Sequence, residues 1–236
     1  MPGKCHRRLT LFLLMAILTS QQAAAAVQES QTGLWSMLFF TRGFHDSAWG
    51  LQGDVQLRQW DVGTDLEQLL LRGGVTYRPH RFDGVLLTLG YADISSGEFG
   101  PSDATNGESR IYQEALLSRR VGDRLQLRHR FRLEQRWVAG QDFRTRFRYA
   151  LFADLPLNGR LSGPGALYLA FYNELFLNGE RRIGDGRRVR WFDRNRTYLA
   201  LGFGLSDKLR AQAGFMHQES DQLGKGQWQL SVHASL

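Results

Sequence analysis

Apolar and polar side chains alternate almost without a break from residue 125 to residue 137. One face carries Leu125, Leu127, Phe131, Leu133 and Trp137, and the other carries Gln126, Arg128, Arg130, Arg132, Glu134 and Arg136. Successive side chains of a β-strand point to opposite faces, so this period of two predicts a strand. The next segment repeats it, with Phe143, Phe147, Tyr149 and Leu151 opposite Arg144, Arg146 and Arg148.

The same period recurs along the chain, whereas the 3.6-residue period of an amphipathic helix is hard to find. Eleven candidate strands, mostly about ten residues long, lie near residues 33–42, 49–58, 68–77, 84–91, 109–118, 125–137, 143–151, 167–175, 197–203, 209–215 and 228–236. Strands in soluble domains usually have about five or six residues, whereas a tilted strand that crosses a membrane needs about 9 to 11. The lengths favour membrane-crossing strands.

The arginines indicate which face of the strands points to the lumen and which points to lipid. An Arg that faces lipid at the bilayer midplane costs about 2 to 4 kcal/mol. Several such arginines on one strand would cost more free energy than the folding of a typical domain provides. The charged face must therefore line a lumen. The apolar face, with Tyr77, Tyr91, Trp137, Tyr149 and Trp228 near strand ends, then faces lipid. Backbone groups in lipid must all be bonded, so the sequence predicts an all-β fold, an up-and-down antiparallel transmembrane barrel of about 10 to 12 strands.

The connections between the candidate strands roughly alternate in length. Residues 79–83, 119–123 and 205–208 are predicted as tight periplasmic turns, and 95–108, 177–193 and 218–226 as long extracellular loops, while the link 155–164 breaks the alternation. If the C-terminus is periplasmic, the ten candidate strands from residue 47 onward cross the membrane in alternating directions. Residues 33–42 break the even count: they would pair with an unrecognised twelfth strand, lie outside the barrel, or enter its mouth.

The first 26 residues predict a secretory signal peptide. Lys4, Arg7 and Arg8 precede the apolar run 11–18, and small residues lead up to Ala26. That run is too short for the alternative, a transmembrane anchor. The sole cysteine, Cys5, lies in this segment, so the mature domain, residues 27–236, has no disulfide or thiol chemistry. A soluble periplasmic barrel with its apolar face turned inward is the rival fold, but its solvent face would be almost uniformly Arg. The last strand ends on Leu236, whereas outer-membrane barrels usually end on Phe.

Several short segments, taken in order, resemble a known family. They are residues 74–77 (GVTY), 110–113 (RIYQ), 129–136 (HRFRLEQR), 146–149 (RFRY), 173–178 (NELFLN) and 193–196 (DRNR). The order is similar to that of a family of uncharacterised small Gram-negative outer-membrane proteins, a domain of unknown function, over nearly the whole mature chain. The resemblance implies an outer-membrane barrel and no established activity, so it supplies no catalytic residue.

Inward-phase charges are the first candidate site. The predicted lumen-lining residues are Glu114, Arg128, Arg130, Arg132, Glu134, Arg136, Arg144, Arg146, Arg148, Glu174 and Arg196. One interpretation is a ladder of cross-strand ion pairs that packs the lumen and fixes register. The other is an arginine-lined constriction that favours anions, since the arginines outnumber the acids. No two acids can be placed at a separation suited to glycosidase or aspartyl chemistry.

Two histidines, His129 and His217, are predicted on the outward face. Some barrel lipases and deacylases place Ser and His there, but no serine is identifiably beside His129, which favours a structural role. No two of the six histidines stand at ligand spacing on one strand, so the sequence predicts no metal site, and it predicts no cofactor.

The third candidate is the arginine-rich loop that follows Asn178. It contains Arg181, Arg182, Arg187, Arg188 and Arg190. Clustered guanidinium groups suit phosphates, so contact with lipopolysaccharide is one interpretation and a solvated loop is the other. The 95–108 loop is acidic, so the two loops would alternatively attract one another and cap the barrel. Arg-x-Arg-x-Arg at strand spacing does not indicate nucleic acid.

The functional prediction is therefore an integral outer-membrane barrel with an ion-paired lumen, a non-enzymatic narrow anion-favouring channel or envelope-structural protein. The alternative is a lipid- or lipopolysaccharide-modifying hydrolase or acyltransferase. The expected partners are outer-membrane lipid, lipopolysaccharide and, during insertion, the barrel-assembly machinery.

Overall fold

A computed structural model describes residues 32–122, 124–220 and 224–236. The described chain forms eleven strands: β1 (Thr32–Gly43), β2 (Trp49–Gln59), β3 (Leu66–Tyr77), β4 (Val85–Gly97), β5 (Thr105–Val121), β6 (Leu125–Val138), β7 (Arg144–Pro156), β8 (Leu167–Asn178), β9 (Phe192–Gly204), β10 (Leu209–Ser220) and β11 (Gly224–Ser235). The predicted signal peptide lies outside the described residues. None of the described residues belongs to a helix that is long and apolar enough to cross a membrane.

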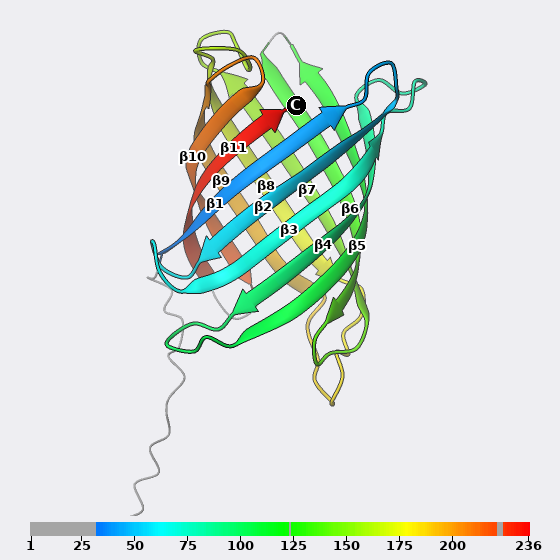
Figure 1. The fold of residues 1–236 in the computed structure, drawn as a ribbon, viewed down its shortest axis with the longest axis vertical. Helices are drawn as coiled ribbons and strands as arrows, with labels where there is room; N and C mark the ends of the chain where they lie inside the picture. The colour runs from blue at the N-terminus through cyan, green and yellow to red at the C-terminus, as the bar shows by residue number, and fades with distance from the viewer. Residues whose placement is uncertain (1–31, 123, 221–223) are drawn as a thin grey trace, which may run out of the picture.

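The strands close into a single barrel, as the alternation predicts (Figure 1). Neighbours in sequence pair antiparallel from β1 to β11, and every strand is steeply tilted in Figure 1. The barrel closes where β1 pairs with β11, and this pair is parallel, with Thr32 opposite Gly226 and Thr41 opposite Ser235. The predicted barrel is confirmed, with this one parallel exception to its antiparallel pairing.

The strand β1 is part of the barrel wall. It lies between β2 and β11, so residues 33–42 neither pair with a twelfth strand, nor lie outside the barrel, nor enter its mouth. Both phases of this strand are apolar: Trp35, Met37 and Phe39 point inward and Leu34 and Leu38 outward. Alternation therefore could not reveal its role.

The two rims of the barrel differ. The links β2–β3, β4–β5, β6–β7, β8–β9 and β10–β11 lie at one rim, here called the loop rim, and the remaining links lie at the other, the turn rim. The predicted long connection 218–226 is wrong, because β10 and β11 extend through most of it, with Gln218 opposite Lys225. Gln218 and Lys225 continue the inward phase of the wall, and their polarity alone indicates a loop.

Two inward glycines show how the wall is kept in register. Gly90 on β4 lies opposite Tyr112 on β5, and Gly202 on β9 lies opposite Tyr168 on β8. A Cβ at either glycine would overlap the neighbouring tyrosine ring. Each ring covers its glycine, an arrangement that ties adjacent strands together.

Candidate functional site: the charged lumen

The interior of the barrel contains a network of ion pairs that joins β5 to β9. Glu134 on β6 lies at its centre: its side chain keeps 2% of its area exposed, and it accepts hydrogen bonds from Arg146 (2.7 Å) and Arg148 (2.6 Å) on β7. Arg110 and Arg132 each approach the same carboxylate to 3.8 Å. Four guanidinium groups thus surround one buried carboxylate.

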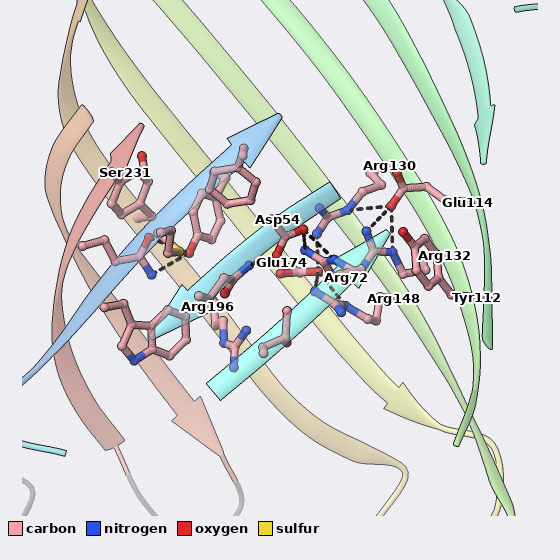
Figure 2. A pocket seen from close by; sticks show the side chains of 18 of the residues that line it. Asp54, Arg72, Tyr112, Glu114, Arg130, Arg132, Arg148, Glu174, Arg196 and Ser231 are labelled. Atoms are coloured by element: carbon pink, nitrogen blue, oxygen red, sulfur yellow. Dashed lines mark hydrogen bonds and ion pairs between the residues drawn. The ribbon is translucent and has the colours of Figure 1, made fainter. Parts of the chain in front are cut away.

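Further carboxylates extend the network across the lumen (Figure 2). Glu174 on β8 accepts from Arg130 and Arg148, each at 2.5 Å. Glu114 on β5 accepts from Arg132, and Arg130 approaches it to 3.7 Å. The arginines bridge carboxylates on different strands, so they lock the relative positions of β5, β6, β7 and β8.

Further ion pairs lie at the edges of this network. Near the loop rim, Glu108 accepts from Arg110 at 2.6 Å and from Arg136 at 2.5 Å. Other inward pairs are Asp54 with Arg72 at 2.7 Å, Asp154 with Arg128 at 2.7 Å, and Asp193 with Arg146 at 2.9 Å and Arg194 at 3.3 Å. Guanidinium groups suit this role because they stay charged and donate along several directions at once.

Aromatic rings stabilise some of the inward arginines by cation–π contacts. The ring of Phe176 on β8 has Arg148 at 4.4 Å and Arg196 at 4.8 Å from its centroid. Trp35 on β1, which is 2% exposed, lies between Arg58 (3.9 Å) and Arg196 (4.8 Å). In the described part of the chain, no salt bridge joins either of these two arginines to a carboxylate. Cation–π contact with a desolvated ring contributes about 2 kcal/mol, so Trp35 partly compensates them.

Polar contacts complete the surroundings of Trp35. Its indole N–H donates to Glu67 at 3.0 Å, and Arg58 donates to Gln56 and Gln68. Arg196 donates to Gln218 at 2.7 Å. Arg58 and Arg196, beside Trp35, thus contact aromatic rings and glutamine amides, whereas most inward arginines of β5 to β7 contact carboxylates.

The structure places all eleven predicted lumen residues on the inner face. Each lies within the network of ion pairs that joins β5 to β9 or along the central cavity. Sequence reasoning missed inward charges that complete the set: Asp54, Arg58, Glu67, Arg72, Glu108, Arg110, Asp154, Asp193, Arg194, Arg210 and Lys225. Asp54 and Arg58 stand on the polar phase of their strand, so alternation could have found them. Glu108 could not be found in this way, since it fell in a segment predicted as loop.

One cavity of about 520 Å³ runs among these side chains. Its lining includes Arg210 and Thr41 near the turn rim and Asn106 and Arg144 near the loop rim. Of the described residues that line it, thirteen are arginines and five are Asp or Glu. The cavity surface is therefore strongly cationic in spite of the ion pairs.

The outward histidines have different surroundings. His129 Nδ1 lies 2.9 Å from the hydroxyl of Tyr149, and its cross-strand partners are Leu117 and Leu151. His217 lies opposite Thr197 and Gly226. Within the described residues, no group of three or more His, Cys, Asp or Glu side chains is arranged to hold a metal ion.

The arginine-rich loop forms a small hairpin beyond the loop rim. Arg182 and Arg188 pair across it, and all five of its arginines are exposed. The loop packs on the β6–β7 link, where Arg187 donates to the carbonyl of Gly140 and Asp142 N–H donates to Ile183. The acidic loop packs against the β2–β3 link, since Gly100 N–H donates to Asp65. Each loop thus has an anchor on a neighbouring link.

Fold and interior together define the class: an all-β closed barrel with a charged, largely buried lumen. A family model for a protein of unknown function, DUF2490, matches residues 32–229, and the chain belongs to this family. No match was found among curated proteins or among solved structures.

Proposed function

We propose that this protein is an integral outer-membrane barrel of Gram-negative bacteria whose lumen is a narrow passage favouring small anions. The observation that carries the proposal is the cationic cavity, whose lining residues come from both rims of the barrel. Fixed guanidinium groups along a narrow, low-dielectric passage raise the local concentration of anions and exclude cations. The ion pairs among β5 to β9 hold the walls of the passage in place.

The outer face supports a location in a membrane. Large apolar residues such as Leu89 (60% exposed), Leu199 (58%), Tyr91 (51%) and Trp228 (51%) point outward. A soluble monomer rarely exposes a continuous apolar surface of this kind. Strands of 11 to 17 residues and the predicted signal peptide agree with the same location.

The exposed guanidinium groups of the arginine-rich loop extend the proposal to the outer surface. Arg181, Arg182, Arg187, Arg188 and Arg190 stand beyond the loop rim, where phosphates of lipopolysaccharide would lie if this rim is extracellular. Binding of the purified barrel to lipopolysaccharide, compared between phosphorylated and dephosphorylated preparations, tests this contact. Equal binding to both preparations would argue against it.

Conductance tests the passage directly. The purified, heat-modifiable barrel is inserted into a planar bilayer, and reversal potentials are taken under a KCl gradient. We expect small conductance steps with a reversal potential shifted toward that of chloride. Silence from a demonstrably folded barrel would favour the second candidate, an envelope-structural barrel, which the near-complete burial of Glu134 and its arginine partners also supports.

The enzymatic alternative is tested separately. A lipid-acting site at His129 requires a nucleophile beside it on the outer face; its cross-strand partners are both leucines, and the hydroxyl in contact with it belongs to Tyr149 and not to a serine. We therefore expect His129→Ala to leave the lipid and lipopolysaccharide acylation profile of the cell unchanged. A changed profile would revive this alternative.

A further inference from the structure

The lumen contains a serine and a histidine that the ion-pair network does not use. Both lie on the inward phase of β11, two residues apart, and the Ser231 hydroxyl oxygen is 3.1 Å from Nε2 of His233. At that distance the hydroxyl donates to the imidazole when Nε2 is unprotonated. Ser231 is 4% exposed, and both side chains line the central cavity. This is the contact that a nucleophile makes with its general base.

The imidazole is held in place by an aromatic ring. The ring of Phe39, on the neighbouring strand β1, stacks on His233 with centroids 4.8 Å apart and an angle of 12° between planes. The parallel pairing of β1 with β11 places these two residues directly opposite one another. Stacking holds the plane of the imidazole.

Donors for a developing negative charge stand on the next strand. Arg210 on β10 lies directly opposite His233, and Gln212 lies opposite Ser231, both on the inward phase. In the described part of the chain, no salt bridge joins Arg210 to a carboxylate. Gln212 is held by its hydrogen bond to the hydroxyl of Tyr168 at 3.1 Å. A guanidinium and an amide thus border the same corner of the cavity.

The site lies close to the turn rim. Arg210 is the second residue of β10 and His233 stands two residues before the end of β11. A small ligand that enters from this rim reaches Ser231 and His233 without passing the ion pairs around Glu134. Figure 2 shows Ser231 apart from the labelled cluster around Glu114, Arg132 and Glu174.

We propose that Ser231 and His233 form a nucleophile–base pair that hydrolyses small esters carrying a negative charge. Ser231 Oγ attacks the ester carbonyl carbon while its proton passes to Nε2 of His233, and the carbonyl oxygen takes up the negative charge beside Arg210 and Gln212. The C–O bond then breaks, and the leaving alcohol takes the proton from His233. Water attacks the acyl-serine in a second step, with His233 as base, and releases the acid and free Ser231.

The substrate class follows from the charges around the pair. Arg210 and Arg128 are the cations of this corner, and only Arg128 has a carboxylate partner, Asp154. Phe39 and Phe152 supply apolar surface. An ester with a short acyl chain that ends in a carboxylate fits this combination. The proposal does not depend on conductance, since a silent barrel can still hydrolyse an ester at its rim.

The test uses the folded barrel in detergent with 4-nitrophenyl hemisuccinate as the charged ester and 4-nitrophenyl acetate as the neutral one. We expect a burst of nitrophenolate, and a succinyl group on Ser231 in mass spectra of the trapped protein. Ser231→Ala abolishes both, and His233→Ala lowers the acylation rate by about 100-fold or more. Arg210→Gln lowers kcat for both esters, because its guanidinium borders the developing oxyanion, and in addition raises KM for the charged ester.

Ser118→Ala is the matched control, because Ser118 also stands on the inward phase near the turn rim, on β5. This variant is expected to keep the wild-type rate. Heat-modifiable migration on gels verifies that each variant is folded. Equal rates in folded wild type and Ser231→Ala, or acylation at another residue, would overturn the proposal.

Discussion

The two sides of the lumen balance their arginines by different means. On the side of β5 to β8, every inward arginine that the structure describes, except Arg144, has a carboxylate partner, and Glu134 and Glu174 each accept hydrogen bonds from two arginines. On the side of β1 and β2, Arg58 and Arg196 lie against the indole of Trp35 and donate to glutamines. The first arrangement cancels charge, and the second stabilises it without cancelling it. The arginines beside Trp35 therefore keep a positive charge that no salt bridge to a described carboxylate offsets, as do Arg144 and Arg210 elsewhere along the cavity.

The largest expected effect comes from removing the central carboxylate. Glu134→Gln leaves Arg146 and Arg148 without a shared partner in a nearly dry interior. Loss of one member of a buried ion pair costs about 3 to 5 kcal/mol, and we expect the upper end. Urea-dependent unfolding of the detergent-folded barrel measures it. Glu98→Gln in the acidic loop is the control, and similar losses in both variants would contradict the central role of Glu134.

Trp35 comes next, because its ring replaces a carboxylate on the other side. Trp35→Leu removes two cation–π contacts and the hydrogen bond to Glu67, and we expect a loss of about 3 kcal/mol. Trp35→Phe keeps a ring and loses the N–H, so its cost is about 2 kcal/mol. The same unfolding experiment separates the two variants. Equal costs would mean that the face of the ring contributes little.

The comparison is sharpest between two arginines. Arg148→Gln removes the guanidinium that bridges Glu134 and Glu174, leaves each with one hydrogen-bonded arginine, and should cost about 3 kcal/mol. Arg196→Gln removes a buried cation without a carboxylate partner, so stability stays within about 1 kcal/mol of wild type.

Arg196→Gln should instead change selectivity. Arg196 lines the cavity, so removing its charge weakens anion attraction by about 1 kcal/mol, the Coulomb energy of two unit charges about 4 Å apart in water, or roughly fivefold in the anion-to-cation permeability ratio. Reversal potentials measure this ratio. An unchanged ratio together with a large loss of stability would show that Arg196 is structural in the same way as Arg148.

The smallest effect is expected outside the lumen. Arg187 on the arginine-rich loop has a side chain 48% exposed, and it pairs with Asp185 at 3.3 Å in solvent. Exposed pairs contribute about 0 to 1 kcal/mol, so Arg187→Gln should leave unfolding unchanged within about 0.5 kcal/mol. A loss comparable to that of the lumen variants would place this loop among the structural parts of the barrel.

Alternation predicted the strands and their inward faces because charge and apolarity separate cleanly along β6 and β7. It did not reveal that the candidate strand 33–42 is part of the barrel wall, since Trp35 points inward from a strand whose outward residues are equally apolar. It also could not tell which arginine meets which carboxylate. Those contacts depend on strand register, which decides that Arg132 lies opposite Glu114 and Arg146 opposite Glu134. The Ser231–His233 contact was open to the same reasoning, because both residues share one phase of β11.

The parallel pairing of β1 with β11 has a topological consequence. Thr32 lies beside Gly226 at the loop rim, whereas Leu236 N–H bonds to Thr41 at the turn rim. The beginning of β1 and the end of β11 therefore lie at opposite mouths of the barrel. In a membrane, labels placed at these two positions would face different compartments. Among the described strands, β2 to β11 form five antiparallel hairpins, and β1 is the single strand left to close the barrel.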